Sequence, residues 1–210
     1  MRKGFILLGL LTGLPLVFAA SHPPSAQDID SFWRTTREKL SLQPMNAEVE
    51  QTKDALPYRT YRVTLTGLGG IRYRAFLAVP VHGESLATRL PAVITSPGYG
   101  GLQQGIMLAE CQRGYVVLQV FPRSQGESEA LWRIDGPEKL TWGIAKPDGY
   151  YYQGAYADLM RGIDFLETRP EVDATRIGIM GTSQGGGIAL AIASLDSRIR
   201  AVSAHLPCLC

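Results

Sequence analysis

The residue with the clearest chemical signature is Ser183, which lies in the pentapeptide Gly181-Thr182-Ser183-Gln184-Gly185. This pentapeptide has the form G-x-S-x-G, and it follows the apolar run Ile177-Gly178-Ile179-Met180 and precedes a helix-like segment. Between a strand and a helix, such a turn raises the serine Oγ above the sheet, and its glycines leave room where the two backbones nearly touch. We therefore predict that Ser183 is the nucleophile of an acyl-transfer reaction. The alternative is a glycine-rich turn whose serine has no catalytic role.

Acyl transfer also requires two backbone N–H groups that stabilise a negatively charged oxygen. Gln184 is the first candidate, because it follows the nucleophile and begins a helix whose N-terminus carries partial positive charge. The second is expected in a loop after an earlier strand, and Gly98-Tyr99-Gly100-Gly101 fits that position; the alternative is an ordinary turn. In the loop 122–128, Arg123 is either a surface charge or a buried hydrogen-bonding fork that stiffens the elbow.

Hydrophobic periodicity predicts the elements that position these residues. Alternation predicts two half-buried strands at 61–65 and 71–79, joined by 67–70 as a hairpin, and continuous apolar runs at 91–95 and 115–121 predict buried parallel strands. The remaining expectations are, in chain order, an amphipathic helix over 28–40, a polar connector over 44–57, a crossover helix within 102–112, a polar loop over 122–148, a helix over 152–166, a strand over 176–180, a helix to about residue 195 and a strand over 201–204.

The order of these elements predicts an α/β fold, a doubly wound and mostly parallel sheet with an N-terminal antiparallel hairpin at its edge. We expect residues 21–210 to form one domain of this kind, incomplete at its C-terminus. Sites in such sheets lie at the carboxyl ends of strands. Because Ser183, Tyr99 and Arg123 each follow a predicted strand, we expect them to converge.

The N-terminus predicts export. Arg2 and Lys3 precede an apolar run over 5–18 and then small residues, which is typical of a secretory signal peptide over 1–20 with cleavage near Ala19 or Ala20. The alternative, a membrane anchor, is disfavoured because the run is shorter than the ~20 apolar residues that span a bilayer. The protein is therefore expected in the periplasm or outside the cell.

Composition and spacing exclude other classes of function. The chain is 210 residues long with a net charge of +2, and it contains no basic run, so we expect no nucleic-acid partner. The three cysteines and three histidines show no metal-ligand spacing, so we expect no metal. Cys111 is predicted to be a small buried residue.

Jointly these motifs resemble the acetyl xylan esterase / cephalosporin-C deacetylase family of α/β hydrolases. The resemblance covers nearly all of the chain after the signal peptide. The matching pieces are Phe32-Trp33, the hairpin from Thr66-Gly67 to Val79-Pro80, Gly98-Tyr99, Pro122 to Gly126, Gly143-Ile144, Tyr150-Tyr151-Tyr152, Pro170 to Asp173, Arg176-Ile177 and Gly181 to Gly187.

The resemblance implies a serine carboxylesterase that removes acetyl groups from acetylated sugars and xylo-oligosaccharides through an acyl-enzyme, without metal or organic cofactor. It implies Ser183 as nucleophile, the backbone N–H groups of Tyr99 and Gln184 as oxyanion hole, and Arg123 and Gln125 as structural support of the site. Many members form ring-like oligomers, so a homo-oligomer is compatible with the resemblance.

The chain departs from the family at two places. Ser124 stands where the family has glycine, so a side chain occupies a position of close approach. The family's triad Asp and His, and its last strands and helices, lie beyond the position of Cys210, so neither triad partner is expected here. His205, at the end of the strand after the elbow, is predicted to be solvated or capping. We expect either a fragment of a longer enzyme or a truncated hydrolase-like product with little activity.

Other substrates stay open, because prolyl oligopeptidase-like peptidases and dienelactone hydrolases share the same elbow. The cluster Tyr150-Tyr151-Tyr152 and the hairpin favour the acetyl esterase. Trp142, Tyr150 and Tyr151 either line a sugar site or belong to the core.

Overall fold

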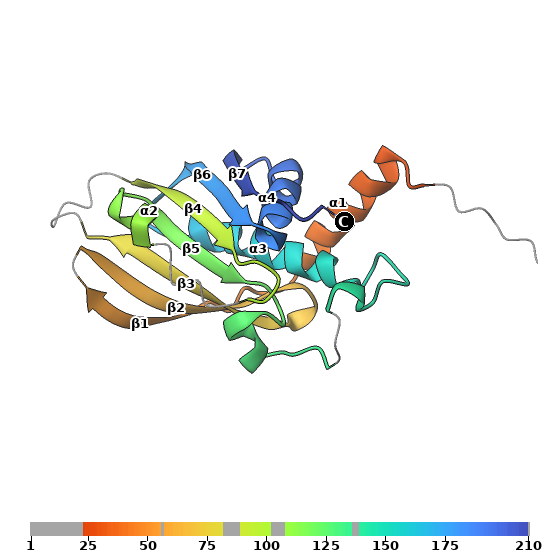
Figure 1. Cartoon of the computed structure of the whole chain (residues 1–210), viewed down its shortest axis with the longest axis horizontal. Helices are drawn as coiled ribbons and strands as arrows, with labels where there is room; N and C mark the ends of the chain where they lie inside the picture. The colour runs from red at the N-terminus through yellow and green to blue at the C-terminus, as the bar shows by residue number, and fades with distance from the viewer. Residues whose placement is uncertain (1–22, 56, 82–88, 102–107, 136–138, 210) are drawn as a thin grey trace, which may run out of the picture.

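The computed structural model describes residues 23–209 except 56, 82–88, 102–107 and 136–138 (Figure 1). The expected signal peptide, residues 1–20, lies outside the described residues. The strands are β1 (Glu48–Ala55), β2 (Tyr58–Thr66), β3 (Arg72–Pro80), β4 (Leu90–Ser96), β5 (Val116–Phe121), β6 (Val172–Thr182) and β7 (Ile199–His205). The helices are α1 (Ala26–Ser41), α2 (Leu108–Gln112), α3 (Tyr151–Glu167) and α4 (Gln184–Leu195), with short 3₁₀ turns at Leu68–Gly70, Gly126–Ala130 and Lys139–Thr141.

All seven of these strands form one sheet in the order β1-β2-β3-β5-β4-β6-β7. The pairs from β1 to β5 are antiparallel, whereas β5, β4, β6 and β7 pair in parallel. The predicted α/β fold, a mostly parallel sheet with an antiparallel hairpin at its N-terminal side, is confirmed. The hairpin pairs Thr66 with Arg72 around the turn.

One expectation about this sheet was wrong. Residues 44–57 were expected to be a polar connector, but residues 48–55 form the edge strand β1. Its sequence, EVEQTKDA, shows no apolar alternation, because an edge strand is held by backbone hydrogen bonds to a single neighbour and can carry charged side chains that discourage further pairing.

Helices cover the two faces of the sheet unequally (Figure 1). α3 and α4 pack on β4, β5, β6 and β7, and α1 packs on α3. The large core on this face includes Ile94, Leu118 and Ile163. Val117, which precedes Leu118 in β5, belongs to a separate small cluster with Ala78 and Cys111 under α2. This alternation shows that α2 lies on the opposite face, and that Cys111 is a buried core residue as predicted.

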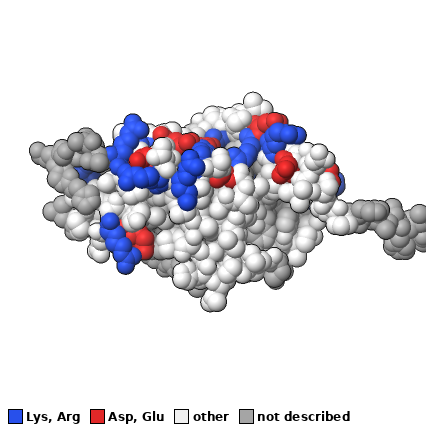
Figure 2. Space-filling view, turned by 90° about the horizontal axis from the view of Figure 1, so that it is seen from above, with Lys and Arg blue, Asp and Glu red and all other residues white. Residues whose placement is uncertain are grey.

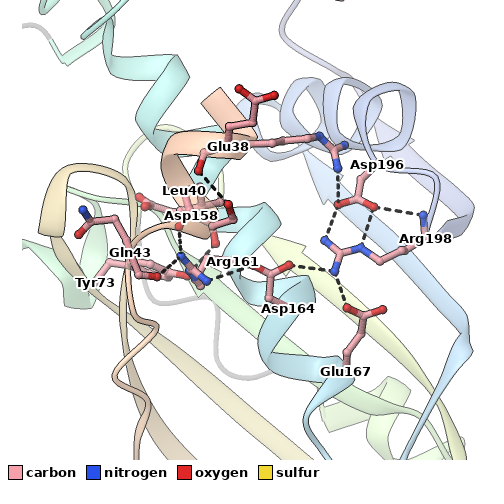
Figure 3. A network of polar contacts seen from close by, with 12 residues as sticks. Glu38, Leu40, Gln43, Tyr73, Asp158, Arg161, Asp164, Glu167, Asp196 and Arg198 are labelled. Carbon is pink, nitrogen blue, oxygen red and sulfur yellow. Dashed lines mark hydrogen bonds and ion pairs between the residues drawn. The ribbon is translucent and has the colours of Figure 1, made fainter. Parts of the chain in front are cut away.

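A polar network fastens α1 to the rest of this layer (Figure 3). Arg161 of α3 donates to the backbone oxygens of Leu40 and Gln43. At the start of α1, Ser25 and Asp28 form a reciprocal capping box. The N-terminal helix therefore has a defined beginning and a defined attachment to α3.

The surface seen from above carries charges of both signs. In Figure 2, basic and acidic side chains lie next to one another in a band, and much of the remaining surface in this view is uncharged. The described residues include ion pairs between exposed side chains, such as Lys39–Asp148 and Arg62–Glu50. No helix in the described part of the chain is long and apolar enough to cross a membrane.

Candidate active site

Ser183 lies in the sharp turn between β6 and α4. Its backbone angles, φ 57° and ψ −121°, fall in a region that side-chain-bearing residues rarely adopt. Its N–H donates to the backbone oxygen of His205 at 2.9 Å, and its own carbonyl accepts from the N–H groups of Gly187 at 3.1 Å and Cys208 at 3.0 Å. The side chain is exposed. A strained backbone that is held on both sides and presents its hydroxyl to solvent matches the predicted elbow.

Close backbone contacts around this turn require glycine. A Cβ at Gly181 would collide with the backbone of Gly185, and a Cβ at Gly185 would collide with the carbonyl oxygen of Ser96. A Cβ at Gly98 would lie 3.8 Å from the Cβ of Ser183. The loop after β4 therefore passes directly beside the serine, as predicted.

The buried side chain of Gln125 joins the two loops that flank Ser183. Its Nε2 donates to the backbone oxygen of Tyr99 at 3.2 Å and also to Oε1 of Gln184. The amide Nε2 of Gln184 in turn donates to the hydroxyl of Tyr152 at 3.0 Å. The structure thus brings together three residues that the sequence singled out, and it adds Tyr152.

Arg123 is a buried fork rather than a surface charge, which resolves the two alternatives for this residue. Its guanidinium donates to both carboxylate oxygens of Asp158, at 3.0 Å and 2.7 Å, and to the carbonyl of Leu68 at 3.1 Å. The backbone N–H of Arg123 also donates to Asp158 at 2.9 Å. These contacts fix the loop after β5 to α3 and to the turn between β2 and β3.

Charge and burial oppose each other in this pair. Burial alone would lower the pKa of Arg123, but the charge and the hydrogen bond of Asp158, with smaller contributions from Tyr73 and Tyr151, together outweigh it and raise the pKa. Burial raises the pKa of Asp158, and the charge and hydrogen bonds of Arg123 oppose that rise. Separating Arg123 from Asp158 would leave a buried charge without a partner, which is strongly unfavourable. The pair therefore holds the loop after β5 against α3.

Ser124 adopts a conformation that glycine prefers. Its φ is 59° and its side chain is fully buried, with Oγ accepting the N–H of Ile134 at 2.9 Å. The close backbone approach expected at Ser124 is found two residues later, at Gly126. A Cβ at Gly101, in the loop after β4, would collide with the backbone of Gly126. The serine therefore keeps the backbone shape expected of a glycine and gains a hydrogen bond.

An aromatic hollow of about 590 Å³ lies between α1, α3, α4 and the last described residues of the chain. Its aromatic lining is formed by Phe32, Trp33, Tyr150, Tyr152 and Tyr156, and Gln184, which is hydrogen-bonded to Tyr152, lines it too. Of the aromatic residues left open by the sequence, Tyr150 lines this hollow, Tyr151 is buried in a core cluster and Trp142 is exposed. Tyr151 therefore belongs to the core.

Three contributors were missed by the sequence reasoning. Asp158 was detectable, because a carboxylate at a buried helical position requires a partner. Tyr152 was noted only as part of a motif. His205 contributes its backbone oxygen to Ser183 while its side chain is exposed, and nothing in residue type reveals a backbone contact.

Within the described ranges, no group of three or more His, Cys, Asp or Glu side chains is arranged to hold a metal ion. Burial raises the pKa of the Cys111 thiol to about 11, which keeps it protonated at neutral pH.

Sequence comparison with known proteins relates this chain to acetyl esterases. Residues 17–210 match the model of the acetyl xylan esterase (AXE1) family. The acetyl esterase Axe7A of Xylanibacter ruminicola is 39% identical over 203 residues, which cover 90% of this chain and 45% of that protein. The chain spans about half the length of the curated relatives it matches.

Solved structures show the same relationship. An acetyl xylan esterase from Paenibacillus sp. R4 superposes with a TM-score of 0.78 at 32% identity, covering 90% of this chain and 62% of that one. Acetyl xylan esterase 1 from Thermoanaerobacterium sp. JW/SL YS485 gives a TM-score of 0.78 at 25% identity, covering 89% and 60%. By sequence and by fold, the chain belongs to the acetyl xylan esterase family.

Proposed function

We propose that the protein is a serine carboxylesterase that removes acetyl groups from acetylated sugars, including xylo-oligosaccharides, through an acyl-enzyme. The observation that carries this proposal is the strained, exposed Ser183, whose neighbours Tyr99 and Gln184 are tied together by one buried glutamine. The relatives named acetyl esterase and acetyl xylan esterase support an acetyl group as the acyl part of the substrate.

In this mechanism Oγ of Ser183 attacks the acetyl carbonyl carbon. The carbonyl oxygen becomes negatively charged and accepts hydrogen bonds from the backbone N–H groups of Tyr99 and Gln184. The N-terminus of α4 adds partial positive charge at the same place. The bond between the acetyl carbon and the sugar oxygen then breaks, and the sugar oxygen takes up the proton that left Ser183. In a second step water attacks the acetyl-serine ester and releases acetate and free Ser183.

The proton of Ser183 must pass to a general base. The family resemblance implies that this base is a histidine oriented by an aspartate. His205 contributes a backbone acceptor at the elbow, and we assign its side chain no role. Without the base, the oxyanion hole and substrate binding alone leave a rate only ~10³–10⁴ above that in water.

We also propose that the protein is exported, because residues 1–20 have the charge and length of a signal peptide. N-terminal sequencing of the protein recovered outside the cytoplasm tests this. A mature chain that begins near residue 20 or 21 is expected, and one that retains Met1 would contradict it.

The proposed function is tested with the enzyme as its gene encodes it. Hydrolysis of acetylated xylo-oligosaccharides is compared with hydrolysis of longer acyl esters and of a proline amide. We expect preference for the acetyl ester, and labelling of Ser183 by a serine-directed phosphonate. Ser183→Ala should abolish both turnover and labelling. Clear preference for the amide, or full activity in Ser183→Ala, would overturn the proposal.

A further inference from the structure

Side-chain contacts continue from the proposed oxyanion hole into α3. Both ends of the Gln184 side-chain amide are hydrogen-bonded. Oε1 accepts from Gln125, and Nε2 donates to the hydroxyl of Tyr152. Gln184 is only 3% exposed. A buried amide N–H that loses its acceptor carries a desolvation cost, so this side chain depends on Tyr152.

The ring of Tyr152 is itself fixed by other rings. It contacts Tyr150, Tyr151 and Tyr156 with centroid distances of 5.7, 5.4 and 5.5 Å. Tyr156 stacks on Trp33 of α1 at 5.5 Å with an interplanar angle of 22°. These contacts leave the hydroxyl of Tyr152 little freedom, so it offers Gln184 a fixed acceptor.

We propose that Tyr152 is a positioning residue for the oxyanion hole, acting through the side chain of Gln184. This inference rests on the proposed function, since it assumes that the N–H groups of Gln184 and Tyr99 stabilise the transition state. Tyr152 holds one end of the Gln184 amide, so that the other end stays bonded to Gln125. Gln125 in turn holds the carbonyl of Tyr99. Loss of the hydroxyl therefore loosens both loops that present the hole.

The hydroxyl stays protonated while it accepts this bond. Burial raises the pKa of Tyr152, and the hydrogen bond from Gln184 opposes that rise. The proposed role is accordingly one of geometry, and it predicts an effect on the transition state without an effect on substrate binding.

The first test is Tyr152→Phe, measured on the enzyme as its gene encodes it. The substitution removes one oxygen and keeps the ring, so we expect kcat for an acetyl ester to fall about fivefold to tenfold while KM changes less than about twofold. The matched control is Tyr115→Phe, which removes a hydroxyl from an exposed residue just before β5 and leaves the ring cluster and the Gln184 contact intact. It should keep kcat near the wild-type value. A rise in KM alone for Tyr152→Phe would indicate direct substrate contact and overturn the proposal.

A double-mutant cycle with Gln184→Ala tests whether the effect passes through Gln184. The alanine keeps the backbone N–H but removes the amide that Tyr152 holds. We expect Tyr152→Phe to have little further effect on kcat in that background, because interacting residues are not additive. Full additivity would contradict the proposal. Should Tyr152→Phe fail to fold, Gln184→Ala alone must lower kcat without raising KM.

These outcomes separate the inference from the proposed function. Retained activity in Ser183→Ala would refute the serine esterase itself. Loss of activity in Ser183→Ala together with unchanged kcat in Tyr152→Phe would refute only the positioning role.

Discussion

At the scale of single residues, Ser183 and Ser124 both have a positive φ, but for different structural reasons. Ser183 has φ 57° at the turn that exposes its hydroxyl, whereas Ser124 has φ 59° in a fully buried position. At Ser183 the strained backbone turn is what exposes the hydroxyl of the proposed nucleophile. At Ser124, the hydrogen bond from Ile134 compensates for the strain. The two serines should therefore respond differently to substitution.

Two substitutions at Ser124 separate strain from hydrogen bonding. Ser124→Ala keeps the unfavourable φ and leaves the buried N–H of Ile134 without its side-chain acceptor, so we expect a loss of about 1–3 kcal/mol in the free energy of unfolding. Ser124→Gly loses the same hydrogen bond but relieves roughly 1 kcal/mol of backbone strain. Urea denaturation should therefore rank wild type above Gly and Gly above Ala. An alanine variant as stable as wild type would contradict the assigned hydrogen bond.

At the scale of elements, α3 connects the site to the N-terminal part of the chain. Its Tyr152 holds Gln184, its Asp158 holds Arg123, and its Arg161 holds the end of α1. The hydroxyl of Tyr73 on β3 also donates to the backbone oxygen of Asp158 at 2.7 Å. A shift of α3 along its axis would disturb all of these contacts at once, so close packing of this helix matters for the site.

Glycine in α3 tests that packing. Alanine normally stabilises a helix by about 1 kcal/mol relative to glycine. In Gly154→Ala, however, the new Cβ would lie 2.6 Å from the guanidinium carbon of Arg123, which is pinned by Asp158 and Leu68. We expect Gly154→Ala to lower the free energy of unfolding by roughly 1–3 kcal/mol.

The matched comparison lies two turns further along the same helix. A Cβ at Gly162 would lie 2.9 Å from Cδ1 of Ile94 and 3.0 Å from Cγ2 of Val120, both methyl ends of apolar side chains that no hydrogen bond or ion pair holds in place. Gly162→Ala should therefore cost less than Gly154→Ala in the same thermal and urea measurements. The reverse order would show that Arg123 is free to move, against the fork assigned to it.

At the scale of the whole molecule, sequence reasoning succeeded where periodicity and a motif coincide. It predicted the parallel strands, the elbow and the approach of the Gly98-Tyr99 loop to Ser183, because these depend on local pattern and on the geometry of parallel sheets. The expected convergence of Arg123 with these residues stays a prediction, since its guanidinium bonds Asp158 and Leu68. It missed β1, whose pairing comes from backbone bonds to β2. It also missed the pairing of Asp158 with Arg123, which are separated by 35 residues in sequence.

A network of charges joins α1, α3 and the turn between α4 and β7 (Figure 3). Asp196 is at its centre, bonded to Arg198 at 2.9 and 2.7 Å and close to Arg37 at 3.7 Å. Arg198 also reaches Asp164 at 2.8 Å and Glu167 on α3. Because the partners come from separate elements, the network forms only when these parts are folded together.

The network predicts how stability depends on pH. Burial alone would raise the pKa of Asp196, but hydrogen bonds and charge from Arg198 and the charge of Arg37 outweigh it and lower the pKa. A carboxyl group whose pKa is lower in the folded state contributes stability above its unfolded pKa of about 3.9, and that contribution disappears as pH falls through the folded pKa.

We therefore expect Asp196→Asn to lower the free energy of unfolding by about 1–3 kcal/mol at pH 7. The difference from wild type should persist down to about pH 4 and shrink below it, as measured by urea denaturation at several pH values. Asp30→Asn makes the same chemical change at an exposed position of α1 and should leave the difference near zero throughout. If the Asp196→Asn deficit stayed constant into strong acid, lost packing rather than lost charge would be its cause, and the network would not be what stabilises the contact between α1, α3 and β7.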